Sequence, residues 1–273
     1  MIILKLGGSI LTKKDSLKPE VDFKNLNRIA IEISDFLKNY DLKNDGLIVV
    51  HGAGSFGHPY AKKYEIGKLF DDNEYFNKRI GFSITHNSVN EFSSIISKSF
   101  IENNIPVISI PPSSLIKTSN KRISYFNLDL IKEYLSQGFL PMLYGDVVLD
   151  DKLKMAVISG DQILSYLAKN LKFEKIILAT DVDGVFNKNP KLYDDAKLIE
   201  VLNSLEELDS FDSVNVDVTG GMFGKIQELF DLADLGIESR IINAKTSNLV
   251  KDALKGIEVK GTLIKAKSQE IDN

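Results

Sequence analysis

The sequence predicts an α/β fold in which helices cover both faces of a mainly parallel β-sheet. Short apolar runs alternate along the chain with longer segments whose apolar residues recur at helical spacing. Several of the apolar runs end at a glycine or an aspartate, as buried strands do where they enter a loop. This alternation of strand and helix is typical of a parallel sheet that is covered on both sides.

The predicted strands begin with the apolar run Ile2–Leu6, which breaks at Gly7-Gly8. The other strands are equally short, at residues 47–50, 107–110, 140–144, 175–179, 240–243 and 259–264. A helix is predicted over residues 22–40, because Leu26, Ile29 and Ile33 recur at intervals of three and four. Further helices are expected around residues 89–100, 129–135, 162–170, 222–235 and 247–254.

The alternation is interrupted by two short apolar runs, at residues 147–149 and 155–158. They flank Asp150-Asp151-Lys152, so we predict a β-hairpin inserted at the rim of the sheet. Residues 187–195 contain Pro190 and mixed charges and are predicted to form a loop. No internal repeat or linker divides the 273 residues, which fit a single domain 1–273 whose two lobes, approximately 1–170 and 171–273, would join near Leu171.

Composition removes several classes of protein from consideration. Cysteine is absent, which excludes disulfides, a thiolate nucleophile and cysteine-ligated metals, and three histidines are too few for a histidine-rich metal centre. A formal charge of −4 does not indicate a broad nucleic-acid-binding face. The N-terminal apolar run is too short for a signal peptide, and no apolar stretch approaches the roughly 20 residues that span a bilayer. We therefore expect a soluble, cytoplasmic protein without a nucleic-acid or membrane partner.

Glycines gather where the predicted strands end. Parallel strands end at one edge of a sheet, where ligands bind. This edge receives Gly7-Gly8-Ser9, the run from His51 to His58, Tyr144-Gly145-Asp146, residues 180–184 and, as a further candidate, residues 243–245. Glycine lets backbone N–H groups approach a phosphate, and a helix that begins there adds a favourable dipole. Two separate glycine turns predict two anionic groups, although Gly7-Gly8 alone is also compatible with a plain tight turn. Neither turn matches the Rossmann or Walker pattern.

Two charged residues near these turns are predicted to belong to the site. Lys5 ends a buried apolar strand, where an unpaired ammonium group would be costly, so an anion at the adjacent turn is its simplest partner. Asp161 follows Ser159-Gly160 and is placed to pair with such a lysine. For Lys13, Lys14 and Lys225, the residues alone favour solvated side chains.

The three histidines receive different predictions. His58 follows Phe56-Gly57 at the start of a helix, within reach of whatever the second glycine turn binds, so we predict that it contacts a ligand. His51 ends a strand and is expected to make a hydrogen bond within the turn. His86 is expected to be structural or exposed, on a polar face before a helix.

Taken together, four motifs resemble the amino acid kinase superfamily over essentially the whole chain: Lys5-Leu6-Gly7-Gly8-Ser9, His51-Gly52-Ala53-Gly54, Thr180-Asp181-Val182-Asp183-Gly184 and Asp217-Val218-Thr219-Gly220-Gly221-Met222. Within it, Gly54-Ser55-Phe56-Gly57-His58 and Ile158-Ser159-Gly160-Asp161 resemble the isopentenyl phosphate kinase family. The resemblance implies an open αβα sandwich whose N-terminal part binds the acceptor and whose C-terminal part binds ATP. It also implies Mg²⁺, a homodimer, and the phosphorylation of isopentenyl phosphate in isoprenoid biosynthesis by the alternative mevalonate pathway.

Site residues follow from this resemblance position by position. Nucleotide and transfer-site residues fall on Lys5, Gly7, Gly8, Ser9, Lys14, Gly54, Asp181, Gly221 and Lys225, and acceptor-phosphate residues on Ala53, His58 and Gly160. Lys5, Lys14 and His58 would act in catalysis, Asp161 would orient lysines, and no protein side chain is expected to ligate a metal. Gln162 stands where many members have a second aspartate, and residues 243–245 depart from the Asn-Gly turn often found there.

Two further interpretations stay open at this point. One is another small-molecule kinase on the same scaffold, particularly a fosfomycin kinase, whose second turn also ends in Phe-Gly-His and whose phosphonate carries a similar charge. The other is a non-catalytic nucleotide-sensing protein, against which the retained lysines argue. The apolar tail of an isopentenyl acceptor would need a pocket beside the second turn, with residues 82–84, Val89 and Phe92 as candidates that core packing explains equally well.

Overall fold

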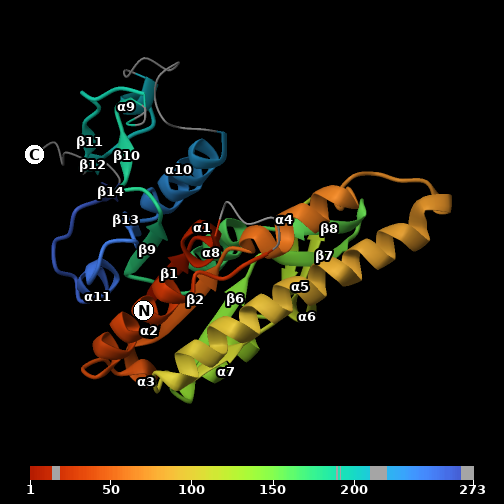
Figure 1. Cartoon of the computed structure of the whole chain (residues 1–273), viewed down its shortest axis with the longest axis horizontal. Helices are drawn as coiled ribbons and strands as arrows, with labels where there is room; N and C mark the ends of the chain where they lie inside the picture. Colours follow the sequence, from red (N-terminus) through yellow and green to blue (C-terminus); the bar gives the residue numbers. More distant parts are fainter. Residues whose placement is uncertain (14–18, 189, 191, 210–219, 266–273) are drawn as a thin grey trace, which may run out of the picture.

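The computed structural model describes residues 1–13, 19–188, 190, 192–209 and 220–265. Within these ranges the chain forms a central sheet of eight strands with helices on both faces (Figure 1). In spatial order they are β12 (Val201–Leu202), β14 (Thr262–Ile264), β13 (Glu238–Asn243), β9 (Lys175–Thr180), β1 (Ile2–Leu6), β2 (Leu47–His51), β6 (Leu140–Tyr144) and β3 (Val107–Ser109). Among these described strands, neighbours run parallel except β13 and β14. The predicted α/β class and mainly parallel sheet are confirmed.

Strand β1 lies inside the sheet, between β2 and β9. All five of its residues are buried; Leu4 and Leu6 belong to the apolar core on one face and Ile3 to the core on the other, because successive side chains of a strand alternate. Leu6 lies opposite His51 of β2 and Ala179 of β9. The three strands therefore end at the same level, and the loops that follow them meet.

The helices divide between the two faces of the sheet. On the face of Leu4, the core receives side chains from α2 (Phe23–Leu37), α4 (Gly54–Lys63), α5 (Tyr75–Glu102) and α11 (Leu249–Leu254). On the opposite face it receives them from α7 (Asp129–Ser136), α8 (Gly160–Asn170) and α10 (Gly220–Ala233). Short helices in the connections are α1 (Gly8–Leu11), α3 (Leu42–Asp45), η1 (Asp72–Glu74), α6 (Pro112–Leu115) and α9 (Glu206–Asp209).

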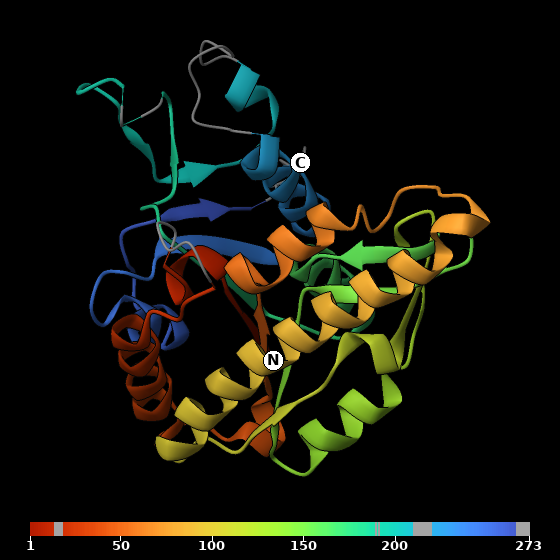
Figure 2. The ribbon, with the colours of Figure 1, turned by 45° about the vertical axis from the view of Figure 1, so that its right-hand side comes forward.

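The predicted hairpin belongs to a second sheet, of four strands in the described part of the chain. Its order is β5 (Arg122–Phe126), β4 (Ile116–Ser119), β7 (Asp146–Asp150) and β8 (Lys154–Ile158), with β7 and β8 forming the antiparallel hairpin that the sequence predicts. Figure 2 shows this sheet beside the N-terminal half of α5, at the opposite end of the molecule from the pair β10 (Val185–Phe186) and β11 (Leu198–Ile199). The hairpin of β4 and β5 was not predicted from the sequence. Its turn residues Asn120 and Lys121 both have positive φ, but a lysine in place of glycine hides the pattern.

A single carboxylate organises the turns of the second sheet. Asp150 is 4% exposed and accepts hydrogen bonds from the backbone N–H groups of Asn120, Lys121, Lys152 and Leu153 and from the Thr118 hydroxyl. Burial alone would raise the pKa of this carboxyl, but the backbone donors outweigh it and hold the pKa of Asp150 well below its usual range. The two hairpins are therefore joined by an ionised side chain.

The largest difference between a predicted and an observed element boundary is at the start of α5. The helix begins at Tyr75 rather than near residue 89, so His86 lies inside it, and the prediction that His86 precedes a helix is wrong. The polar run from Thr85 to Ser88 interrupts the apolar face, and Gly81 weakens the helical signal. That glycine is needed because a Cβ there would lie 2.2 Å from Cγ of Tyr64, which packs on the helix.

Candidate active site

The two glycine turns touch each other through their backbones. A Cβ at Gly8 would lie 2.6 Å from both Cα and N of Gly54, and a Cβ at Gly52 would lie 2.7 Å from N of Gly8. Gly54 itself has φ +53°, a conformation that side chains disfavour. Only glycines allow this approach, which places the turn after β1 directly against the turn after β2.

Two longer helices begin at the same place. α4 begins at Gly54, and α8 begins at Gly160, where the Ser159 hydroxyl accepts a hydrogen bond from N–H of Gln162 at 3.1 Å. A Cβ at Gly160 would lie 3.2 Å from the His51 carbonyl oxygen, so the start of α8 packs on the end of β2. Two helix N-termini and two glycine turns thus present backbone N–H groups to one region, which favours bound anions.

The charged side chains near the two glycine turns have polar partners. Lys5 is 6% exposed, and its ammonium group forms an ion pair with Asp161. Ser9 donates a hydrogen bond of 2.7 Å to Oδ1 of Asp181, which joins the first turn to the loop after β9. The predicted pairing of Asp161 with Lys5 is confirmed, and it holds the lysine head at the rim of the sheet.

These groups surround a cavity of about 680 Å³. Ten of the predicted site residues line it: Lys5, Gly7, Gly8, Ser9, Ala53, Gly54, His58, Gly160, Asp161 and Asp181. Of the other three, Lys14 lies outside the described residues. Gly221 and Lys225 fall in α10, of which only the backbone is described at these positions. The structure therefore brings together most of the predicted site residues.

The end of the cavity near α4 and α5 has apolar walls interrupted by Thr85 and Asp146. His58 is exposed on α4 at its mouth, and the walls include Val89 of α5, Val147 of β7 and Val157 of β8. Phe92, an alternative candidate, does not line the cavity; it is fully buried and stacks on Phe56 with ring centroids 4.6 Å apart. An apolar group beside a bound anion therefore has a place in this cavity.

The other two histidines are held by hydrogen bonds in different places. His51 is fully buried between the rings of Phe92 and Tyr144, and burial lowers its pKa to about 4. Its Nδ1 lies 3.1 Å from the Gly52 carbonyl oxygen, the local hydrogen bond that the sequence predicts. His86 packs against the second sheet, where Nδ1 lies 2.9 Å from Oδ2 of Asp146, and this hydrogen bond raises the pKa of His86.

Several lining residues are not among the predicted site residues. Thr12 donates a hydrogen bond of 2.9 Å to the Gly8 carbonyl oxygen and so braces the first turn. Asp146 and Thr85 also line the cavity. Asp146 belongs to Tyr144-Gly145-Asp146, which the sequence places at this edge of the sheet, whereas nothing in the sequence distinguishes Thr12 and Thr85 from other polar residues.

The two departures from the superfamily pattern have structural counterparts. The side-chain oxygen of Gln162 is buried and has no hydrogen-bond partner among the residues that the structure describes. Asn243 ends β13 and donates to Oδ1 of Asp183 at 2.8 Å, and N–H of Lys245 donates to the Asn243 side chain at 3.0 Å. The turn after β13 is therefore closed by the Asn243 side chain rather than by a glycine.

Comparison with known proteins agrees with this geometry. The model of the amino acid kinase family matches residues 1–243. The chain belongs to the amino acid kinase family. Among its relatives, the isopentenyl phosphate kinase of Methanothermobacter thermautotrophicus is 47% identical and aligns over 98% of this chain and 100% of its own. That of Methanocaldococcus jannaschii is 40% identical over 97% and 98%, respectively.

A solved structure of an isopentenyl phosphate kinase resembles the chain as closely as these relatives do. A crystal structure of isopentenyl phosphate kinase superposes with a TM-score of 0.86 at 44% identity, over 97% of this chain and 99% of that one. The family that the glycine turns predicted is confirmed. In the described part of the chain, no helix is long and apolar enough to cross a bilayer. The same residues contain no group of three or more His, Asp or Glu side chains placed to hold a metal ion.

Proposed function

We propose that this chain transfers the γ-phosphoryl group of ATP to isopentenyl phosphate and releases isopentenyl diphosphate and ADP, a step of isoprenoid biosynthesis by the alternative mevalonate route. The observation that carries the proposal is that both glycine turns, the Lys5–Asp161 pair and His58 line one cavity with an apolar end. The names of relatives at 40–47% identity support the same acceptor.

The chemistry needs no general base. One oxygen of the acceptor phosphate, already ionised near neutral pH, attacks the γ-phosphorus, while the bond from that phosphorus to the β,γ-bridging oxygen breaks and ADP leaves. The obstacle is the mutual repulsion of two polyanions, which preorganised positive charge and N–H donors reduce. At about 4 Å and an effective dielectric constant of about 20, one cation–anion contact contributes on the order of 4 kcal/mol before desolvation.

Individual residues then take separate tasks. Lys5, held by Asp161, faces the donor phosphates from the end of β1, and the backbone of Gly7, Gly8 and Ser9 binds beside it. The backbone N–H of Gly54 donates to the transferred phosphoryl group, because Gly54 lies against Gly8. Following the family pattern, we assign Lys14 to the transferred group and Gly221 and Lys225 to ATP.

The acceptor occupies the opposite end of the cavity. Ala53, Gly160 and His58 surround its phosphate, with His58 donating a hydrogen bond, and the isopentenyl chain lies against the apolar walls near Val89 and Val157. Because the start of α8 supplies N–H groups at Gly160, a doubly charged head group is favoured over a carboxylate.

Magnesium would enter with ATP, and the donor set fits it. Mg²⁺ usually keeps several waters and takes one or two protein carboxylates together with phosphate oxygens. Asp181 lines the donor side of the cavity and is the carboxylate that would hold it, since Asp161 is paired with Lys5. When bound, the ion neutralises charge on the β- and γ-phosphates.

A panel of acceptors tests the proposed function. The purified protein is assayed by coupled ADP release with isopentenyl phosphate, dimethylallyl phosphate, fosfomycin and acetylglutamate. We expect the highest kcat/KM with isopentenyl phosphate. Preference for fosfomycin would assign a phosphonate kinase, and ATP binding without turnover of any acceptor would assign a nucleotide sensor.

Replacement of His58 by alanine tests the acceptor site. A hydrogen bond to a charged group contributes about 1.5–3 kcal/mol, so kcat/KM for isopentenyl phosphate should fall roughly 10- to 100-fold while KM for ATP stays near the wild-type value. Lys63→Ala, which removes an exposed side chain further along α4, is the control. An unchanged kcat/KM in His58→Ala would remove His58 from the mechanism.

The homodimer and the cytoplasmic location that the sequence analysis expects belong to the same proposal. Sedimentation of the purified protein would test the first, and fractionation of cells would test the second.

A further inference from the structure

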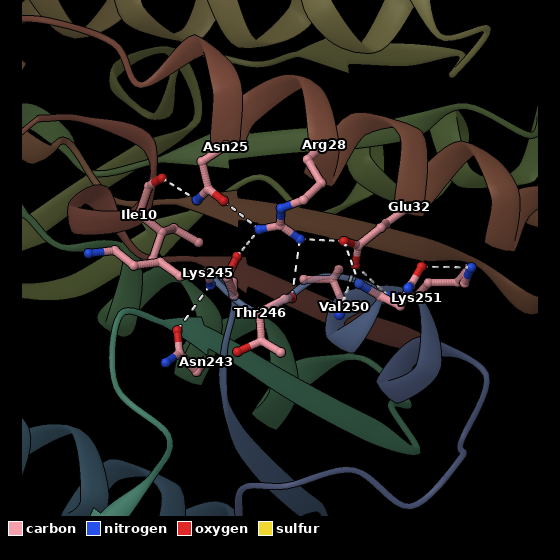
Figure 3. Close-up of polar contacts among 11 residues, drawn as sticks. Ile10, Asn25, Arg28, Glu32, Asn243, Lys245, Thr246, Val250 and Lys251 are labelled. Atoms are coloured by element: carbon pink, nitrogen blue, oxygen red, sulfur yellow. Dashed lines mark hydrogen bonds and ion pairs between the residues drawn. The ribbon is translucent and has the colours of Figure 1, made fainter.

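One face of α2 contacts two segments that are far apart in the sequence. Asn25, Arg28 and Glu32 are spaced by three and four residues, so they share one side of the helix. Asn25 and Glu32 are 8% and 4% exposed. In Figure 3, Asn25 lies beside Ile10, and Arg28 and Glu32 face the segment from Thr246 to Lys251.

Asn25 contacts the first glycine turn. Its Nδ2 donates a hydrogen bond of 2.6 Å to the carbonyl oxygen of Ile10 (Figure 3). Ile10 adjoins Ser9, which donates to Asp181. The asparagine therefore fixes the end of the segment whose backbone lines the donor side of the cavity.

Arg28 contacts the loop after β13. Its guanidinium donates to the carbonyl oxygens of Ala244 and, at 3.2 Å, Thr246. The same group donates to Oδ1 of Asn25 and pairs with Glu32. One arginine thus ties residues 244–246 to the side chain that holds Ile10.

Glu32 contacts the start of α11. Its carboxylate accepts hydrogen bonds from N–H of Asn248 at 2.9 Å, Val250 at 3.0 Å and Lys251 at 3.2 Å. The N-cap residue of this helix, Asn248, has φ +67° and makes no side-chain cap of its own. A carboxylate from α2 therefore takes the place of the N-cap and sets the conformation of residues 244–248.

The loop that these residues hold lies next to the donor end of the cavity. The cavity ends at Thr180 and Asp181 after β9, and Ala244 donates its N–H to the Thr180 carbonyl oxygen at 2.8 Å. β13 runs parallel to β9, with Asn243 opposite Thr180, so the loop continues the same edge of the sheet. The lining also includes residues of α4, α5 and the second sheet, on the side where we place the acceptor, so we place the nucleoside toward β13.

We propose that Asn25, Arg28 and Glu32 are positioning residues for the nucleoside triphosphate. They keep the turn of residues 7–10, which binds its phosphates, at a fixed distance from the loop of residues 244–248, which borders its nucleoside. This inference rests on the proposed function for the identity of the donor. A partly buried ion pair adds little stability compared with apolar packing, which fits a role in specifying the position of a loop.

Substitutions of Arg28 test the proposal by kinetics. In Arg28→Met, KM for ATP should rise at least tenfold while KM for isopentenyl phosphate stays within twofold of wild type. Arg28→Lys keeps the charge but loses the planar fork that reaches two carbonyls and Glu32, so it should resemble Arg28→Met. Lys24→Met, which removes an exposed cation from the same helix, is the control and should leave both constants unchanged.

Other results would overturn the proposal. A purely structural role predicts a lower melting temperature with both KM values unchanged, and a role of charge alone predicts rescue by Arg28→Lys. If Arg28→Met does not fold, Asn25→Ala, which retains the Arg28–Glu32 pair, is measured in its place with the same expected rise in KM for ATP.

Calorimetric titration with ATP keeps this inference separate from the proposed function. The dissociation constant of Arg28→Met for ATP should be at least tenfold above that of wild type, whether or not isopentenyl phosphate is turned over. If the dissociation constants for ATP differ in this way but isopentenyl phosphate is not turned over, only the proposed acceptor is rejected and the positioning role stands. Equal affinity in the two proteins, or no ATP binding by wild type, would reject the positioning role.

Discussion

Gly8→Ala is the sharpest test of the contact between the two glycine turns. The new Cβ would lie 2.6 Å from Cα and N of Gly54, whereas ordinary contact begins at 3.4 Å, so the turns must separate by about 0.8 Å. Both opposing atoms belong to the backbone and no side chain can rotate away. A displacement of about 1 Å at a reacting centre costs roughly 10²-fold in rate, and overpacking costs about 1–3 kcal/mol of stability.

The assay compares Gly8→Ala with Gly145→Ala by coupled ADP release and thermal unfolding. Gly145 also lines the cavity, but its Cβ would lie 3.3 Å from the nearest atom, the Ile158 carbonyl oxygen. We expect kcat to fall about 10²-fold in Gly8→Ala, with a loss of about 2–10 °C in Tm, and less than about fivefold in Gly145→Ala. A folded Gly8→Ala protein with kcat within threefold of wild type would refute the argument, and so would equal losses in the two variants.

Three further predictions concern charged groups. Asp161→Asn removes the negative charge that pairs with Lys5 but keeps the shape of the side chain at position 161, so kcat should fall about 10- to 100-fold with little change in Tm. A kcat near that of wild type would show that Lys5 does not need the Asp161 charge. Asp150 has a lowered pKa when folded, so its stabilisation is present above about pH 4 and is lost as pH falls. Asp150→Asn should therefore lower the free energy of unfolding in urea by about 2–3 kcal/mol at pH 7. The difference between wild type and variant should be smaller at pH 3, and a difference that does not change with pH would contradict this. Asp146→Asn should lower the pKa of His86 in an NMR titration, and an unchanged pKa would assign the shift to another group.

Much of the fold follows from local patterns in the sequence. The strands of the main sheet are short apolar runs, and α2 shows its apolar face directly, because Leu26, Ile29 and Ile33 are all fully buried. The start of α5 could not be found this way. Its first half packs on Tyr64 and on the second sheet, which bury small and polar residues such as Gly81 and Thr85, and such contacts leave no apolar period.

The candidate site could be predicted where backbone geometry alone restricts the residue. Gly8 must be glycine because a Cβ there would meet the backbone of Gly54. Gly54 must be glycine because its φ is +53° and a Cβ there would meet the Thr12 side chain. The network of Asn25, Arg28 and Glu32 was not predicted, since its partners are backbone groups more than 200 residues away for Arg28 and Glu32. Nothing in a helix sequence distinguishes such residues from an exposed i,i+4 pair.

The order of strands explains why the reaction would occur at this edge of the sheet. β2, β1 and β9 are adjacent, and each is followed by one part of the site: the turn with Ala53 and Gly54, the turn with Gly7 and Gly8, and the loop with Asp181. Paired strands lie about 4.8 Å apart, and reacting atoms must come within about 3–3.5 Å. Anions bound one strand apart are therefore almost at reacting distance before any side chain moves. The close approach of Gly8 to Gly54 holds the two turns against each other, so side chains are needed mainly to neutralise charge and to hold the outer loops in place.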